Sequence, residues 1–80
     1  MNEDIKVQKN STWRHRKYDP ADSDPLNFTY KVTGVIFDAE RDVRMVLYVP
    51  LYRSIHLINE CSDGYARTIE NFLEKFTLVQ

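Results

Sequence analysis

Two runs in the middle of the chain alternate large apolar residues with other residues at a period of two. One face of the first run carries Phe28, Tyr30, Val32, Gly34 and Ile36. After polar residues at 38–42, one face of the second carries Val43, Met45, Leu47, Val49 and Leu51, and the other carries Arg44, Val46, Tyr48, Pro50 and Tyr52. Such alternation is typical of β-strands, and the short polar interruption predicts an antiparallel hairpin. Because proline cannot donate to a ladder, the second strand must end, bulge or lie at an edge at Pro50.

Shorter elements are predicted on both sides of this hairpin. A basic strand at 13–18 precedes an irregular acidic loop at 19–25 that contains two prolines. After the hairpin we expect a strand at 55–58, a turn at 61–64 and an extended piece at 65–67. Thr68 can then cap a short helix with Ile69, Phe72 and Leu73 on one side, followed by a closing strand through Phe76 and Leu78. The predicted fold is mostly β, either a small, strongly curved antiparallel sheet or an SH3-like barrel with one short helical turn.

Length and charge limit what such a domain can be. With 80 residues the chain makes one core, so we expect an N-terminal arm at 1–12 and a single domain at 13–80. Domains of this size are marginally stable, and self-association into a homo-oligomer is a common remedy. The single cysteine and the acidic first residues favour a cytoplasmic protein, and no apolar run is long enough for a membrane. A net charge of −1 gives no general attraction for nucleic acid.

The pattern gives no reason to expect catalysis, a metal or another cofactor. The candidate metal ligands are His15, His56, Cys61 and the aspartates of the acidic loop, but their spacing matches no metal-binding motif. Those aspartates, Asp19, Asp22 and Asp24, are ordinary turn residues beside prolines. Cys61 and His56 lack an orienting acid, so an inert cysteine is the simpler interpretation.

A binding role fits the residues better. The candidate ligand-binding residues share cationic, hydrogen-bonding or aromatic chemistry suited to an anionic ligand that carries a ring: Arg14, His15, Tyr48, Tyr52 and Arg67. Trp13 and Tyr65 are further aromatic candidates. On a regular strand Arg14 and His15 point to opposite faces, so they cannot both line one pocket. The alternative is that the aromatic residues pack in the core and that the arginines pair with Glu40, Asp42 or Glu70.

The order of short motifs resembles a known family. Trp13-Arg14-His15, then Tyr-x-Val-x-Gly at 30–34, Val-x-Tyr-x-Pro-Leu-Tyr at 46–52 and Tyr-x-Arg at 65–67 are similar to motifs of the bacterial and phage domain of unknown function numbered 1653. The resemblance spans residues 13–79 and implies a compact β-barrel-like fold without an assigned reaction. Departures are Arg16, Lys17 and Tyr18, where the family has a glycine, and Thr68, where it has a proline.

These observations predict a non-catalytic domain that binds a small anionic ligand, such as a nucleotide or a nucleotide-derived signal. A phage protein that sequesters such a signal from host defence would fit the resemblance. One alternative is a barrel that binds single-stranded nucleic acid, although the net charge argues against it. Another is a protein-interaction module or an inhibitor that uses the face of Val46, Tyr48, Pro50 and Tyr52.

Overall fold

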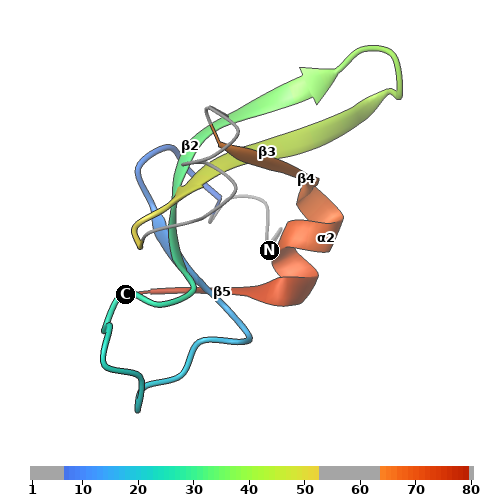
Figure 1. Ribbon diagram of the computed structural model, residues 1–80. Helices are drawn as coiled ribbons and strands as arrows, with labels where there is room; N and C mark the ends of the chain where they lie inside the picture. The colour runs from blue at the N-terminus through green and yellow to red at the C-terminus, as the bar shows by residue number, and fades with distance from the viewer. Residues whose placement is uncertain (1–6, 53–63, 80) are drawn as a thin grey trace.

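A single antiparallel sheet organises the protein. The computed structural model describes residues 7–52 and 64–79 (Figure 1). Its elements are β1 (Thr12–His15), β2 (Thr29–Asp38), β3 (Val43–Pro50), β4 (Tyr65–Thr68), α2 (Ile69–Lys75) and β5 (Phe76–Leu78). The strand order is β4-β3-β2-β1-β5, and each neighbouring pair is antiparallel. This confirms the mostly β fold.

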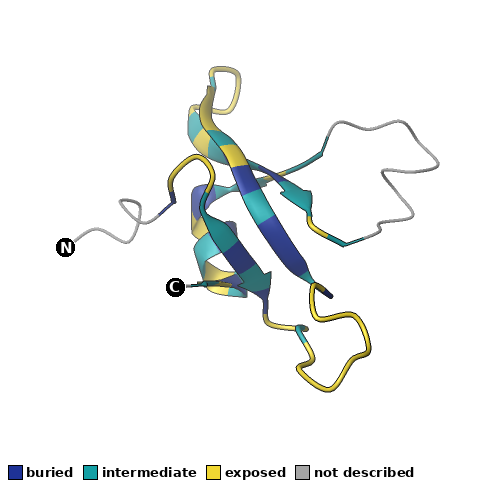
Figure 2. Cartoon of the chain, turned by 90° about the vertical axis from the view of Figure 1, so that its left-hand side faces the viewer, coloured by how far each residue is buried: buried dark blue, intermediate teal, exposed yellow. Residues whose placement is uncertain are grey.

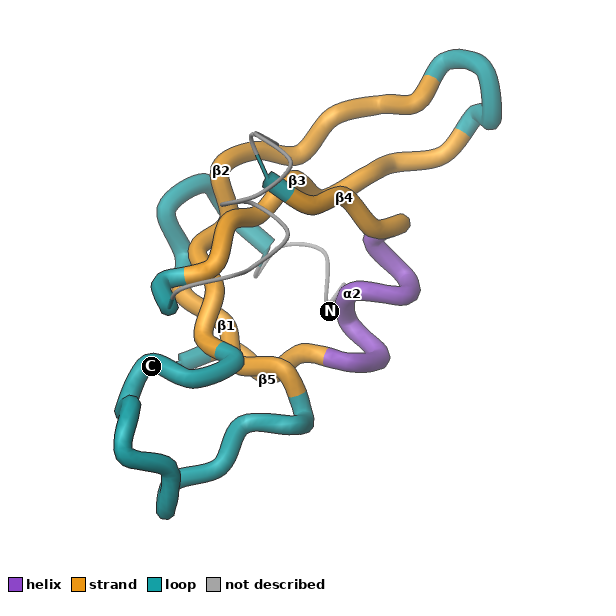
Figure 3. The backbone as a smooth tube through the Cα atoms, in the orientation of Figure 1, coloured by secondary structure: helices purple, strands orange, loops and turns teal. Residues whose placement is uncertain are grey.

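The sheet is strongly curled. β4 and β5 are its two edge strands, yet they are joined directly through α2 (Figure 3). In a flat sheet the two edge strands would be far apart, and a helix of seven residues could not connect them. The sheet therefore bends and brings the two edge strands close together. The result is the small, strongly curved antiparallel sheet that the sequence predicts, with no ladder between β4 and β5 in the described part of the chain.

A β-bulge divides β2 into two halves. The pairing with β3 shifts between Val32 and Gly34, so Thr33 is an extra residue in the ladder. Before the bulge the predicted alternation holds, since Tyr30 and Val32 are buried. After it the alternation moves by one residue. The expectation that Ile36 shares the face of Tyr30 is therefore wrong.

The second half of the hairpin shows where the inner face continues. Val35 pairs with Val46 and Phe37 with Arg44, and residues directly opposite each other in an antiparallel pair share a face. Since Val46 is fully buried, Val35 and Phe37 belong to the inner face, and Ile36 points outward.

The core lies on the inner face of the curl, against α2. Its centre is an aromatic stack of Phe72 on Phe76, with ring centroids 4.3 Å apart, and Trp13 meets Phe72 edge-on. Trp13 is 2% exposed and donates its indole N–H to Ser11 Oγ, so it serves packing. Figure 2 shows the buried residues as dark blue segments along the strands and the helix. Val7, at the start of the described chain, also joins the core.

The buried side of β3 is the one that carries Val46 and Tyr48, which are 0% and 4% exposed. These two side chains are therefore not available for the protein-interaction face of Val46, Tyr48, Pro50 and Tyr52 that the sequence offers as an alternative. Pro50 ends β3, as its missing N–H predicts.

Local signals place the remaining turns. Thr68 caps α2 as predicted, because its hydroxyl accepts the Asn71 N–H. In the acidic loop, the carboxylates of Asp19, Asp22 and Asp24 each accept a backbone N–H two residues later, which confirms turn structure. The strand expected at 55–58 and the turn at 61–63 lie outside the described residues. Within those residues, no helix has the length and apolarity that crossing a membrane requires.

Candidate ligand-binding cluster

Arg67 is the centre of the candidate site. It stands on β4 opposite Val46, on the inner face, and the curl of the sheet brings it over Phe76 of β5, with Cζ 5.5 Å from the ring centroid. Its Nε–H donates to Tyr48 Oη at 2.7 Å, and Nη1 donates to Asn71 Oδ1. A guanidinium has five N–H donors, so these two neutral acceptors hold it in one orientation and leave donors for a ligand.

The polar contacts of Arg67 in the described chain are all with uncharged groups. In the described ranges, no carboxylate lies within ion-pair distance of Arg67, whereas Arg41 at the hairpin turn has Asp38 3.9 Å away. A half-buried cation with only neutral partners is a suitable place for an anion to bind. The expectation that the arginines pair with Glu40, Asp42 or Glu70 therefore does not describe Arg67.

His15 also packs against the Phe76 ring. The two rings are perpendicular, with centroids 5.0 Å apart, and His15 is 8% exposed. The Lys17 backbone N–H donates to His15 Nδ1, so the neutral imidazole carries its proton on Nε2. Burial, together with the positive charge of Arg67, lowers the pKa of His15 below its ordinary value of 6.5. His15 is thus a neutral hydrogen-bond donor at physiological pH.

Tyrosine hydroxyls complete the polar part of the cluster. Tyr52 Oη and Tyr30 Oη lie 2.8 Å apart in a hydrogen bond. Burial, reinforced by that bond, raises the pKa of Tyr30 far above 10, and burial also raises the pKa of Tyr48 even though Arg67 opposes the shift. The Tyr30 and Tyr48 hydroxyls therefore stay protonated and uncharged, so they do not neutralise Arg67.

Further aromatic rings connect these residues, and the rings of Tyr30, Tyr48 and Phe76 are themselves part of the core. Tyr30 meets Phe76, Tyr48 and Tyr52 edge-on, and Phe28 packs beside Tyr52. We call the set of His15, Tyr30, Tyr48, Tyr52, Arg67 and Phe76 the Arg67 cluster. Sequence reasoning missed Tyr30 and Phe76 as members. The hairpin register could have indicated Tyr30, because Tyr30 lies opposite Pro50, and Pro50 is two residues before Tyr52.

Arg14 is the predicted site residue that the structure does not bring into the cluster. It follows Trp13 and precedes His15, so the strand alternation turns it to the outer face, where its neighbours across the sheet are Thr29 and Thr77. Its Cζ lies 4.1 Å above the ring of Tyr18. Four of the five predicted residues are therefore neighbours, and Arg14 is separate.

The surroundings of His15 are cationic. Besides Arg67, the side chains of Lys17, Arg16 and Lys75 lower its pKa, and the Arg16 N–H donates to the Lys75 carbonyl at 2.9 Å. The basic residues after β1 thus lie in a turn beside the end of α2, rather than in the predicted strand. They add positive charge near the Arg67 cluster without entering it.

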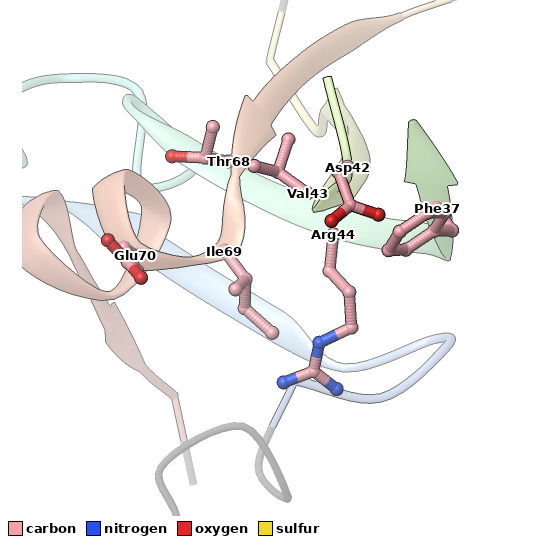
Figure 4. A pocket seen from close by; sticks show the side chains of 7 residues that line it. All are labelled: Phe37, Asp42, Val43, Arg44, Thr68, Ile69 and Glu70. Carbon is pink, nitrogen blue, oxygen red and sulfur yellow. The ribbon is translucent and has the colours of Figure 1, made fainter. Parts of the chain in front are cut away.

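One pocket lies away from the Arg67 cluster. It has a volume of about 580 Å³ and lies between the β2–β3 hairpin and the start of α2 (Figure 4). It contains none of the predicted site residues, and its cation, Arg44, has Asp42 and Glu70 among the lining residues. Because these acids offset the positive charge, this pocket suits an anion less well than the Arg67 cluster does.

In the described ranges, no three of the histidine, cysteine, aspartate and glutamate side chains are grouped as metal ligands. Cys61 and His56 lie outside those ranges. Comparisons of the chain with protein-family models, with curated proteins and with solved structures find no match. The resemblance to the domain family numbered 1653 therefore stays a prediction.

Proposed function

We propose that this protein is a non-catalytic domain that binds a small anionic ligand carrying a ring, such as a nucleotide or a nucleotide-derived signal. The observation that carries the proposal is the state of Arg67, which is fixed by Tyr48 and Asn71 but has no carboxylate partner in the described part of the chain. Arginine forks favour phosphate and carboxylate groups because two parallel N–H donors match two oxygens.

The rest of the Arg67 cluster supplies what the remainder of such a ligand requires. His15 offers a neutral N–H donor, and Tyr52 is half-buried beside Phe28, which gives aromatic surface at the edge of the cluster. Aromatic faces bind the flat rings of bases by stacking. Sequestration of a host signal by a phage protein is the biological role that the family resemblance would suggest.

Isothermal titration calorimetry tests the proposal with three probes: ATP, a cyclic dinucleotide and inorganic phosphate. The key variant is Arg67→Met, which keeps a long apolar side chain but removes the fork. Hydrogen bonds to charged groups contribute about 1.5–3 kcal/mol, so nucleotide affinity should fall about ten- to hundredfold.

The matched control is Arg41→Met, because that side chain is 74% exposed at the hairpin turn and lies outside the cluster. It removes the same charge and should leave affinity unchanged. Absence of heat with both nucleotides, or equal affinity for wild type and Arg67→Met, would show that this site does not bind such ligands. Native mass spectrometry of protein isolated from its own host would reveal a retained ligand directly.

Single-stranded nucleic acid is the second candidate. The observation that favours it is the additional positive charge of Arg16, Lys17 and Lys75 around His15. Counterion release makes such binding fall steeply with salt, whereas a pocket for one small ligand depends on salt much less. Oligonucleotide binding that weakens by orders of magnitude between low and high salt would favour this candidate.

A further inference from the structure

The outer half of β2 has a strand on one side only. β1 pairs with β2 over Thr29 to Lys31, and the chain just before β1 reaches Val32 through hydrogen bonds from Asn10 and to Ser11. Beyond Val32, the structure as described pairs β2 with β3 alone. The tip of the hairpin extends past β4 and α2 (Figure 1). On the side of β2 away from β3, the described chain has no strand next to residues 34–38, so one row of their backbone groups faces outward.

The side chains along this edge are apolar and exposed. Val35, Ile36 and Phe37 are 38%, 48% and 56% exposed. Monomeric proteins usually protect an edge strand with lysine, proline or inward-pointing charge. Residues 34–37 contain none of these, and the bulge at Thr33 lies at one end, so it does not interrupt the regular ladder of the outer half.

We propose that this edge pairs with the same edge of a second copy of the chain, which forms a two-fold symmetric dimer. In an antiparallel pair, residues directly opposite each other share a face. A two-fold axis perpendicular to the sheet keeps each residue on its own face, so one residue must lie directly opposite its own copy in the partner, with the axis midway between them. Centring it on Ile36 places Ile36 opposite the partner's Ile36 on the outer face. The same register places Val35 opposite the partner's Phe37, twice, on the inner face.

Neighbouring registers are poorer. Centring on Val35 places Ile36 opposite a glycine and Phe37 opposite Thr33, which belongs to the bulge. Centring on Phe37 places Ile36 opposite Asp38. The register centred on Ile36 joins six apolar side chains and sets each Asp38 opposite Gly34, so no like charges face each other. This self-complementarity selects a second copy as the occupant, and added contacts of this kind stabilise domains of this size.

Sedimentation equilibrium over a concentration series tests the dimer. Ile36→Lys places two ammonium groups opposite each other at the axis and should raise the dimer dissociation constant about tenfold or more. Leu26→Lys is the matched control, because Leu26 is also apolar and 45% exposed but lies in the loop between β1 and β2. It should dimerise like the wild type.

Cross-linking provides a second measurement in case Ile36→Lys loses its circular dichroism signal. Cysteines at the axis bring their Cβ atoms within about 5.5 Å. In a Cys61→Ser background, Ile36→Cys should form a disulfide-linked dimer with oxidised glutathione, and Leu26→Cys should not. A wild type that stays monomeric overturns the proposal and leaves the edge to a strand from another protein. The proposal is also overturned if the Ile36→Lys variant folds and still dimerises like the wild type. It is overturned as well if the wild type dimerises but the Ile36→Cys variant does not cross-link.

Discussion

The hydroxyl of Tyr48 holds Arg67 in place, and removing it should destabilise the protein measurably. Tyr48→Phe keeps the ring, whose contacts with Tyr30, Phe72 and Phe76 do not involve the hydroxyl. It deletes only the acceptor that receives the Arg67 Nε–H at 2.7 Å. The change in stability therefore reports this hydrogen bond and not a cavity.

The expected magnitude follows from the setting of the bond. Hydrogen bonds to charged groups contribute about 1.5–3 kcal/mol, and because Arg67 is half-buried, water replaces part of the loss. We expect about 1.5 kcal/mol, at the lower end. For a domain of this length that corresponds to a fall in Tm of about 6–12 °C. Total stability should be about 4–12 kcal/mol, so the variant remains folded and measurable.

Urea unfolding of a double-mutant cycle with Arg67→Met provides the assay. If the two side chains interact, the coupling free energy between Tyr48→Phe and Arg67→Met should be about 1 kcal/mol. Tyr18→Phe is the control, because no hydrogen bond of the Tyr18 hydroxyl is found in the described structure and its ring lies under Arg14. Its effect should stay within about 0.5 kcal/mol. A Tyr48→Phe variant as stable as the wild type, or a coupling near zero, would refute the view that Tyr48 orients Arg67.

Two further predictions concern the core and its histidine. Phe72→Ala empties the fully buried position that stacks on Phe76 and should lower the free energy of unfolding by about 3–5 kcal/mol in urea unfolding, whereas Phe72→Leu, which keeps most of the volume, should lower it less. The lowered pKa of His15 means that its contribution to stability is present above pH 6.5 and is lost as the pH falls from 6.5 toward the folded-state pKa. Urea unfolding at pH 7.5 and pH 5 should show a smaller acid loss for His15→Gln than for wild type.

Elements with local signals were predictable from the sequence. The alternating runs predict β2 and β3, the polar residues between them predict the turn, and Pro50 predicts the end of β3. The hydroxyl of Thr68 predicts the start of α2. In each case neighbouring residues supply the cause, so no knowledge of the distant chain is needed.

The bulge at Thr33 was the main structural feature that the alternation did not predict. A glycine inside a strand, here Gly34, is a signal for a bulge, but it does not show on which side the extra residue lies. The consequence is large, because a shift of one residue exchanges the faces of everything that follows. Val35 and Phe37 thereby joined the inner face, and Ile36 became the outward residue of the exposed edge.

Membership of the site depended on the curl, which no local pattern encodes. Strand alternation predicts that Arg14 and His15 separate, and it leaves open which of them faces the tyrosines. The short helix between the two edge strands decides this, because it brings Arg67 of β4 over Phe76 of β5, and Phe76 pairs with His15. Sequence reasoning could therefore name four of the residues, but not the ring that joins them.

Two arginines in this chain show what sets Arg67 apart. Arg41 is highly exposed and lies beside the carboxylate of Asp38. Water would screen the charge of Arg41 even if that carboxylate were absent. Arg67 is half-buried, and its acceptors are a tyrosine hydroxyl and an asparagine amide, neither of which carries charge. Those acceptors direct the guanidinium without neutralising it, and its positive charge adds to the effect of burial in lowering the pKa of His15. An anion bound at this point would compensate that field, which is why the proposed ligand is anionic.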